Sequence, residues 1–162
     1  MSVIAARVSS DCIEIASDSI IIKDDLKCTY KKLREINNMI IGGCGDADEL
    51  TMMFIYAEKH KPKTATTESV LKFISGFRKY KMQLFDKDLS DNEYFLAYKG
   101  VLFVIDGTFV AHVSNYLSIG VGSKYAHAAL ETGCSATRSV EVACKLCCYT
   151  AGPVESFKMS IN

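Results

Sequence analysis

The sequence has no excess of charge of either sign and no long apolar run. Lysine and arginine together number 19, and so do aspartate and glutamate, which makes the formal net charge zero. A protein without a strong positive field is not expected to hold nucleic acid or an anionic membrane surface. No apolar run reaches the roughly 18 residues of a membrane-spanning helix, and the N-terminus lacks a signal-peptide pattern. We therefore expect a cytoplasmic protein with no nucleic-acid or membrane partner.

The usual patterns of metal sites and disulfide frameworks are also missing. The histidines His60, His112 and His127 are scattered, and the CxxC of Cys144 and Cys147 has no second CxxC or histidine pair near it. The cysteines number seven, and this odd count favours reduced thiols over paired ones. We expect no metal and no cofactor, and we interpret the clustered cysteines as small core residues.

Apolar residues make up 49% of the 162 residues, which is enough to bury a large core. This length fits one domain, and the sequence contains no internal repeat, linker or low-complexity segment. We therefore expect a single domain over residues 1–162. The even balance of charge also limits repulsion between copies, which is compatible with self-association.

Short apolar segments separated by turn residues predict antiparallel strands. Lys99-Gly100 and Asp106-Gly107 have the composition of hairpin turns. The groups of strands are separated by pairs of helices, an order that favours antiparallel sheets covered by helix layers over a parallel βαβ fold. The predicted strands cover residues 3–8, 12–16, 20–22, 33–36, 39–44, 94–98, 101–105, 108–112, 116–121 and 154–159.

The start of each predicted helix is marked by a capping signal or by helical spacing of apolar residues. Asp46 and Glu49 form a capping-box pair at the first helix, and Ser123 is expected to cap the third, which Gly133 ends. The predicted helices run from Asp46 to about residue 59, over residues 67–84, from Ser123 through residue 132, and across residues 140–147.

The first helix carries apolar residues on more than one side. Met52, Ile55 and Tyr56 lie off its main apolar stripe. A surface helix with apolar residues on both faces is expected to cover a second contact, which favours an oligomer. The residues expected to be buried are Leu50, Met53, Phe54 and Ala57 on the first helix and Val70, Ile74, Phe77 and Leu84 on the second.

The N-terminus holds a candidate nucleophile. Ser2 follows Met1, and a small second residue normally permits removal of the initiator methionine. A terminal serine carries a hydroxyl and an α-amine, whose ordinary pKa is near roughly 8, so the amine can act as a base toward its own hydroxyl. Because many proteins begin with Met-Ser, this feature alone is a weak signal.

Four segments, in order, resemble the β-type subunits of the proteasome and most closely the bacterial HslV peptidase, which are N-terminal-nucleophile (Ntn) hydrolases. SVIAARVSSDCIEIASDS begins at Ser2 and matches the nucleophile, strand, hairpin and acidic turn of the family without gaps. YKKLREINNMIIGGCGDADEL resembles the segment of lysine, strand, glycine-rich turn and Asp-capped helix. NYLSIGVGSKYAHAALETG and VACKLCCYTAG resemble the glycine-rich turn with its helix and the end of the last helix.

This resemblance implies a four-layer αββα sandwich and assigns roles to four residues. Ser2 matches the nucleophile, and Lys32 matches the family lysine, whose positive charge would lower the pKa of the Ser2 hydroxyl and amine. Asp18 matches the acid that holds and orients this lysine. Gly43 matches the glycine whose N–H donates to the oxyanion. Taken singly, Lys32 is typical of a surface lysine and Asp18 of a turn residue.

The resemblance further implies a serine/threonine-type peptidase that hydrolyses unfolded proteins inside a homo-oligomeric ring, with an AAA+ ATPase as a partner. Two alternatives stay open: a non-catalytic ring-forming relative, and an amidohydrolase acting on a small amide. The chain departs from the family at several positions. Val121 stands where the family has the serine of a GSG turn, Cys148 and Ala151 where proteasome subunits have Asp and Ser, and Lys145 where an acid is common.

Overall fold

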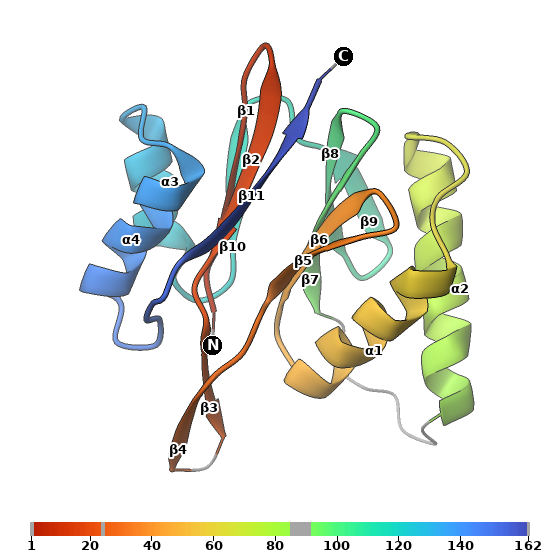
Figure 1. The fold of residues 1–162 in the computed structure, drawn as a ribbon, viewed down its shortest axis with the longest axis horizontal. Coiled ribbons are helices and arrows are strands. Elements are labelled where there is room, and N and C mark those ends of the chain that lie inside the picture. Colours follow the sequence, from red (N-terminus) through yellow and green to blue (C-terminus); the bar gives the residue numbers. More distant parts are fainter. Residues whose placement is uncertain (1, 24, 85–91, 162) are drawn as a thin grey trace.

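The computed structural model describes residues 2–23, 25–84 and 92–161. Within them, two antiparallel sheets face each other, and a pair of helices covers the outer side of each sheet (Figure 1). The layers therefore follow the order helix pair, sheet, sheet, helix pair. This arrangement confirms the predicted αββα sandwich and the α+β class.

The strands form two main sheets and one separate hairpin. The four-stranded sheet has the order β10-β1-β2-β11, made of Tyr116–Ile119, Ile4–Val8, Cys12–Ser17 and Glu155–Ser160. The five-stranded sheet has the order β5-β6-β7-β8-β9, made of Leu33–Ile36, Met39–Cys44, Glu93–Tyr98, Val101–Asp106 and Phe109–His112. The hairpin consists of β3 (Ile20–Lys23) and β4 (Leu26–Thr29).

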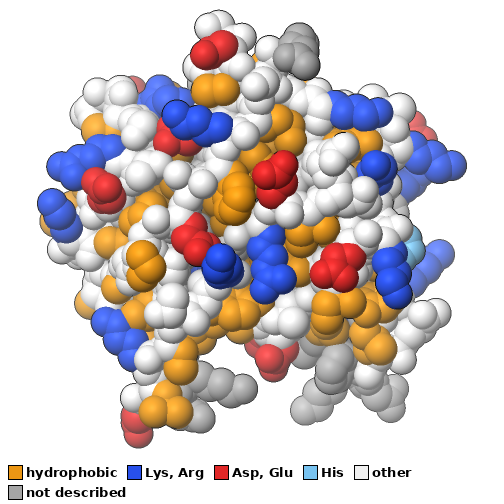
Figure 2. Space-filling view, in the orientation of Figure 1, with side chains coloured by type: hydrophobic (Ala, Val, Ile, Leu, Met, Phe, Trp, Pro, Cys, Tyr) orange, Lys and Arg blue, Asp and Glu red, His pale blue; other side chains and the backbone are white. Residues whose placement is uncertain are grey.

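The helices fall into two pairs, one on each sheet. They are α1 (Ala47–Lys59) and α2 (Thr67–Leu84) beside the five-stranded sheet, and α3 (Ser123–Glu131) and α4 (Ala136–Leu146) beside the four-stranded sheet. None of the helices in the described ranges combines the length and apolar composition needed to cross a membrane. Figure 2 shows positive and negative side chains interspersed on one face of the molecule, as the balanced composition predicts.

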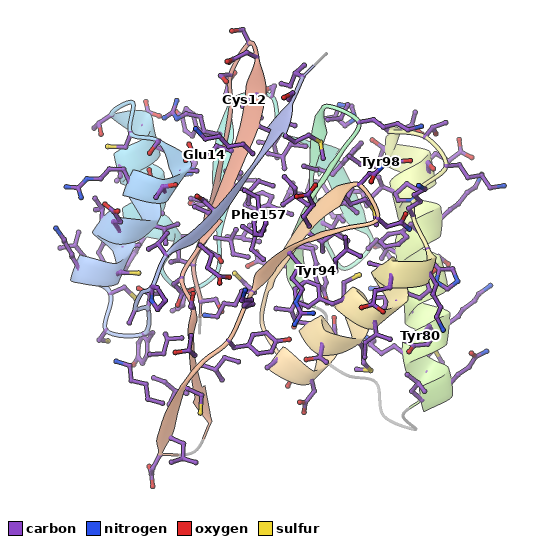
Figure 3. The ribbon with its side chains drawn as sticks, viewed as in Figure 1. Cys12, Glu14, Tyr80, Tyr94, Tyr98 and Phe157 are labelled. Atoms are coloured by element: carbon purple, nitrogen blue, oxygen red, sulfur yellow. The ribbon has the colours of Figure 1, made fainter. Side chains whose placement is uncertain are left out.

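The inner strands β6 and β7 of the five-stranded sheet are buried on both faces. Successive side chains of a strand point to opposite faces, so these strands contribute to two cores. On β6, Met39 and Ile41 pack under α1 and α2, whereas Ile40 packs between the two sheets. Tyr94 on β7 lies on the helix side and Phe157 on β11 lies between the sheets (Figure 3). A third apolar cluster joins the four-stranded sheet to α3 and α4.

The strand predictions are confirmed to within two residues, with one omission. The strand Leu26–Thr29 was not predicted. Its sequence Leu-Lys-Cys-Thr alternates between apolar and polar residues, but each of the four residues is exposed, so this strand has no buried face.

The prediction of apolar residues on a free face of α1 is wrong for two of three residues. Met52 and Tyr56 are buried, and of the three only Ile55, with 46% exposed, faces outward. Tyr56 packs against the rings of Phe73 and Phe77 from α2. The second apolar side of α1 is therefore covered by α2 within the same chain. On α2, Leu84 is exposed rather than buried, because it lies in the last turn.

The helix starts agree with the sequence in part. Asp46 caps α1 and accepts hydrogen bonds from the N–H groups of Asp48 and Glu49. Glu49 does not complete a capping box, because its buried carboxylate binds Lys81 instead. The cap of α3 is Gly122, without a side-chain bond, and the predicted cap Ser123 is the first helical residue.

The buried pair of Glu49 and Lys81 joins α1 to α2 at a distance of 2.8 Å. In Lys81→Met the carboxylate stays buried without its cation, so we expect the free energy of unfolding to fall by about 3 kcal/mol. The double variant Glu49→Gln/Lys81→Met removes the buried carboxylate charge together with its cation and should recover most of that loss. Urea unfolding measures the free energy of unfolding of both variants. A Lys81→Met variant as stable as the parent chain would contradict the expectation.

Candidate active site

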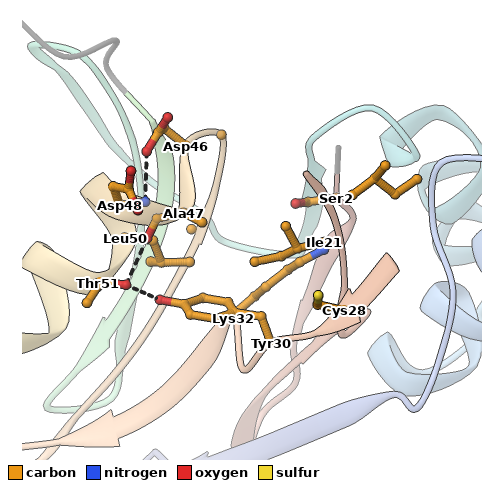
Figure 4. A pocket seen from close by; sticks show the side chains of 13 residues that line it. Ser2, Ile21, Cys28, Tyr30, Lys32, Asp46, Ala47, Asp48, Leu50 and Thr51 are labelled. Carbon is orange, nitrogen blue, oxygen red and sulfur yellow. Dashed lines mark hydrogen bonds between the residues drawn. The ribbon is translucent and has the colours of Figure 1, made fainter. Parts of the chain in front are cut away.

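A pocket of about 460 Å³ lies between the start of β1, the β3–β4 hairpin and the first turn of α1. Three of the four predicted site residues line it, namely Ser2, Lys32 and Gly43. Figure 4 shows Ser2 on one side, Asp46 with the start of α1 on the other, and Lys32 between them. The fourth predicted residue, Asp18, stands behind Lys32 and binds it.

Ser2 is held through its backbone by a glycine turn. Its carbonyl accepts a hydrogen bond from the N–H of Gly122 at 3.2 Å. Gly120 in the same turn has a φ of +87°, and a Cβ on it would lie 2.5 Å from the Ser2 carbonyl oxygen. Only glycine permits this conformation with so close an approach. The turn from Gly120 to Gly122 therefore fixes the residue that carries the candidate nucleophile, and Ser2 is only 4% exposed.

Asp18 and Lys32 form a buried ion pair next to Ser2. The Lys32 Nζ lies 2.8 Å and 2.9 Å from the two carboxylate oxygens of Asp18. The same carboxylate accepts the N–H of Val3 at 2.9 Å. A buried pair is tolerable when further hydrogen bonds satisfy its lone pairs. Asp18 therefore orients Lys32 and, through Val3, also fixes the chain directly after Ser2.

Two glycines, Gly43 and Gly45, line the opposite wall of the pocket. They differ in whether the N–H group donates a hydrogen bond within the described residues. The N–H of Gly43 donates to the carbonyl of Lys32 at 3.2 Å. Gly45 has a φ of +138°, and no hydrogen bond from its N–H is found within the described residues. Gly45 directly precedes the cap Asp46, a position that sequence reasoning passed over in favour of Gly43.

Cys44 lies between these glycines but outside the pocket. Its thiol is 5% exposed and lies close to Gly120, on which a Cβ would be 2.8 Å from the sulfur. Burial raises the pKa of the Cys44 thiol far above its ordinary value, against the opposing effect of the Lys32 charge. The thiol is therefore neutral and unreactive near pH 7.

A second cavity, of about 750 Å³, is larger but lacks such a constellation. It lies at the β5–β6 and β7–β8 turns. Its lining contains Lys61, Lys63 and Lys99 and no acidic residue among the described residues. Among the described residues, no group of histidine, cysteine, aspartate and glutamate is placed to hold a metal ion. Both linings contain a hydroxyl, a lysine and a glycine, and in the smaller pocket the lysine is also oriented by a buried carboxylate.

The structure also places three positions at which the sequence departs from the family that it resembles. Val121 in the glycine turn is 46% exposed, and Cys148 is exposed as well. The carbonyl of Ala151 accepts the N–H of Ser19 at 3.2 Å. The structure places none of these three side chains in the pocket lining.

No family model and no curated protein matches the sequence. Solved structures do match. The chain is similar to Thiobacillus denitrificans BPH in complex with epoxomicin, with a TM-score of 0.88, 17% identity and 99% of both chains covered. It is similar to the eukaryotic HslV of Trypanosoma brucei, with a TM-score of 0.74, 14% identity and coverage of 98% and 99%.

A third similar structure is Anbu, the ancestral beta-subunit, from Yersinia bercovieri. Here the TM-score is 0.78 at 14% identity, over 98% of this chain and 81% of Anbu. At such identities a likeness establishes the fold, which these structures share over nearly all of the chain. The chain therefore has the proteasome-like fold of the Ntn-hydrolases.

Proposed function

We propose that this chain is an Ntn peptidase of the proteasome and HslV type, and that its nucleophile is the hydroxyl of Ser2. The single observation that carries the proposal is the buried Asp18–Lys32 pair beside Ser2 on a pocket, within this fold. The proposal requires removal of Met1, which lies outside the described residues. Ser2 would then offer both a hydroxyl and an α-amine at the pocket.

The chemistry proceeds by acyl transfer. The Ser2 hydroxyl attacks the peptide carbonyl while the α-amine accepts its proton. The tetrahedral oxyanion then collapses, the C–N bond breaks, and the proton passes to the departing amine. Water hydrolyses the resulting ester and frees Ser2. The Lys32 ammonium, held by Asp18, stabilises negative charge on the attacking oxygen throughout.

The oxyanion needs a backbone donor on the far wall of the pocket. The resemblance predicts Gly43 as this donor, but the Gly43 N–H already donates to the Lys32 carbonyl. An oxyanion could bind this N–H only by sharing it with that carbonyl or by displacing that carbonyl. Gly45 lines the same pocket, and its N–H has no such partner among the described residues. We therefore propose Gly45 as a second donor, since a preorganised N–H contributes most where it needs no rearrangement.

The rest of the lining describes the side chain that the pocket would accept. Ile21 from the hairpin and Leu50 from α1 supply apolar walls, and Ala47 leaves space between them. The hydroxyls of Tyr30 and Thr51 bind each other at 2.7 Å. They are therefore less available to form hydrogen bonds with a substrate. A peptide residue with an apolar side chain fits this lining, as expected for an enzyme acting on unfolded proteins.

We also propose that the chain works as a homo-oligomeric ring in the cytoplasm, fed by an AAA+ ATPase. Its fold is that of HslV and of the Anbu beta-subunit. Apolar side chains are exposed on several elements, with Leu26, Met82, Phe109 and Leu146 each at least 60% exposed. Burial of such side chains between copies would stabilise an assembly. The ring would keep the nucleophile away from folded proteins.

A non-catalytic ring subunit is the second candidate. Two observations favour it: the Gly43 N–H is engaged, and the glycine turn carries Val121 in place of a serine. Both candidates predict assembly, and only the first predicts turnover that depends on Ser2.

Ser2→Ala is expected to abolish hydrolysis of fluorogenic peptides, because the variant has no hydroxyl to form the ester, and to leave assembly intact. Ser2→Thr keeps a hydroxyl and should retain activity. Intact mass should show loss of Met1 in the active protein. It should also show binding of epoxomicin, the compound bound by the similar Thiobacillus protein, to the parent chain and to Ser2→Thr but not to Ser2→Ala. Full activity in Ser2→Ala, or in protein that keeps Met1, would refute the assignment.

Lys32→Ala and Asp18→Ala are each expected to lower kcat by orders of magnitude, since each destroys the oriented positive charge. Because the two residues act as a unit, the double variant should be little worse than either single one. Lys72→Ala, which breaks an exposed ion pair with Glu68, serves as the control and should leave kcat unchanged. Additive losses would argue against the pairing.

The assembled protein should scatter light as a particle many times the 17.9 kDa mass of one chain at micromolar concentration. This is expected because contacts between copies would bury the exposed apolar residues. A monomer over a wide concentration range would exclude the ring and would favour the small-amide amidohydrolase.

A further inference from the structure

Three consecutive residues, Asn92 directly before β7 and Glu93 and Tyr94 at its start, bind both walls of the pocket from behind. Asn92 and Tyr94 point to the side of α1 and α2, and Glu93 points to the side of Ser2. This follows from the alternation of side chains along an extended chain and from their hydrogen bonds. None of the three lines the pocket, and no short-range sequence pattern marks them.

Asn92 holds the wall that contains Gly45. Its Oδ1 accepts the N–H of Asp46 at 2.6 Å, and its Nδ2 donates to the carbonyl of Asp46 at 2.8 Å. A Cβ on Gly45 would lie 2.0 Å from the same Oδ1. Two hydrogen bonds to one residue fix both its position and its rotation, so the amide of Asn92 determines where the Gly45 turn stands.

Tyr94 and the Asn92 backbone extend this support to the first turn of α1. The Tyr94 hydroxyl donates to Glu49 Oε1 at 2.8 Å, and the Asn92 N–H donates to the same oxygen at 3.1 Å. The second oxygen of Glu49 binds Lys81. Glu49 is 1% exposed, so these bonds form away from water, where they are stronger and lock the helix start to β7.

Glu93 holds the opposite wall. Its Oε2 accepts the N–H of Gly120 at 3.1 Å, and Gly122 in the same turn donates to the Ser2 carbonyl. The middle residue of the turn is Val121, whose side chain cannot accept a hydrogen bond. The carboxylate of Glu93 is therefore an outside anchor for the turn that fixes Ser2.

We propose that Asn92, Glu93 and Tyr94 are positioning residues that set the distance between Ser2 and the Gly45 wall. One strand end anchors both glycine turns, so the nucleophile and the oxyanion donors move as one unit. This inference rests on the proposed function for its effect on turnover. Its structural part, the anchoring of the two turns, can be measured separately.

Two variants of Glu93 separate geometry from charge. Glu93→Gln keeps an oxygen at the same reach for the Gly120 N–H but loses the charge. Glu93→Asp keeps the charge but withdraws the oxygen by one methylene. We expect Glu93→Gln to retain most of kcat with an unchanged pH profile, and Glu93→Asp to lose at least about tenfold in kcat with a smaller change in KM.

Amide hydrogen exchange supplies a readout that does not need catalysis. In Glu93→Asp, exchange should speed up at the amides of residues 120–122 and not in the distant strand β9. Asn92→Ala should speed it up at residues 45–49. Glu141→Ala, which removes an exposed partner of Arg138, is the control and should change neither exchange nor kcat.

Unchanged exchange at both turns in Glu93→Asp and Asn92→Ala would overturn the anchoring. A Glu93→Gln variant as impaired as Glu93→Asp, with a shifted pH profile, would overturn positioning in favour of an effect of charge. If the parent chain hydrolyses no peptide while the exchange pattern appears as expected, the proposed function fails and the anchoring stands.

Discussion

The buried ion pair of Asp18 and Lys32 is the interaction on which the rest of the site depends. Asp18 follows β2 of one sheet, and Lys32 precedes β5 of the other, so the pair joins the two facing sheets at one end. Removing both charges from water is expensive, and the N–H of Val3 offsets part of that cost by binding the same carboxylate. The segment that carries Ser2 is thus fixed to the ion pair and to both sheets at once.

The location of the site follows from how the sandwich is filled. Apolar side chains such as Ile15, Phe95 and Ile40 fill the space between the sheets, which leaves no room there for charges that need partners. The buried polar residues Ser2, Asp18 and Lys32 lie instead at the end of the sandwich, where loops offer backbone N–H groups. Glycines in the turns at this end let the backbone of one sheet approach that of the other.

The sequence predicted the elements that depend on a local hydrophobic pattern or a helix cap. It did not predict features that depend on contacts between distant segments. The strands Leu33–Ile36 and Met39–Cys44 and the cap Asp46 were predicted because each depends on near neighbours. The burial of Tyr56 depends on where α2 packs, which no pattern within α1 reveals. Ser2, Lys32 and Gly43 were named through resemblance. Glu93 was missed because its partner Gly120 is 27 residues away.

The anchors behind the pocket show that a glycine turn can be supported by residues outside the turn. A backbone turn needs an acceptor for its N–H, and the physics does not prescribe which residue supplies it. Here the side chain within the turn is Val121, and the acceptor comes from Glu93 on another strand. The same logic applies to Gly45, whose neighbour Asp46 is held by Asn92. Asn92, directly before β7, and Glu93, its first residue, thus supply both anchors, because adjacent side chains of an extended chain point toward the two walls of the pocket.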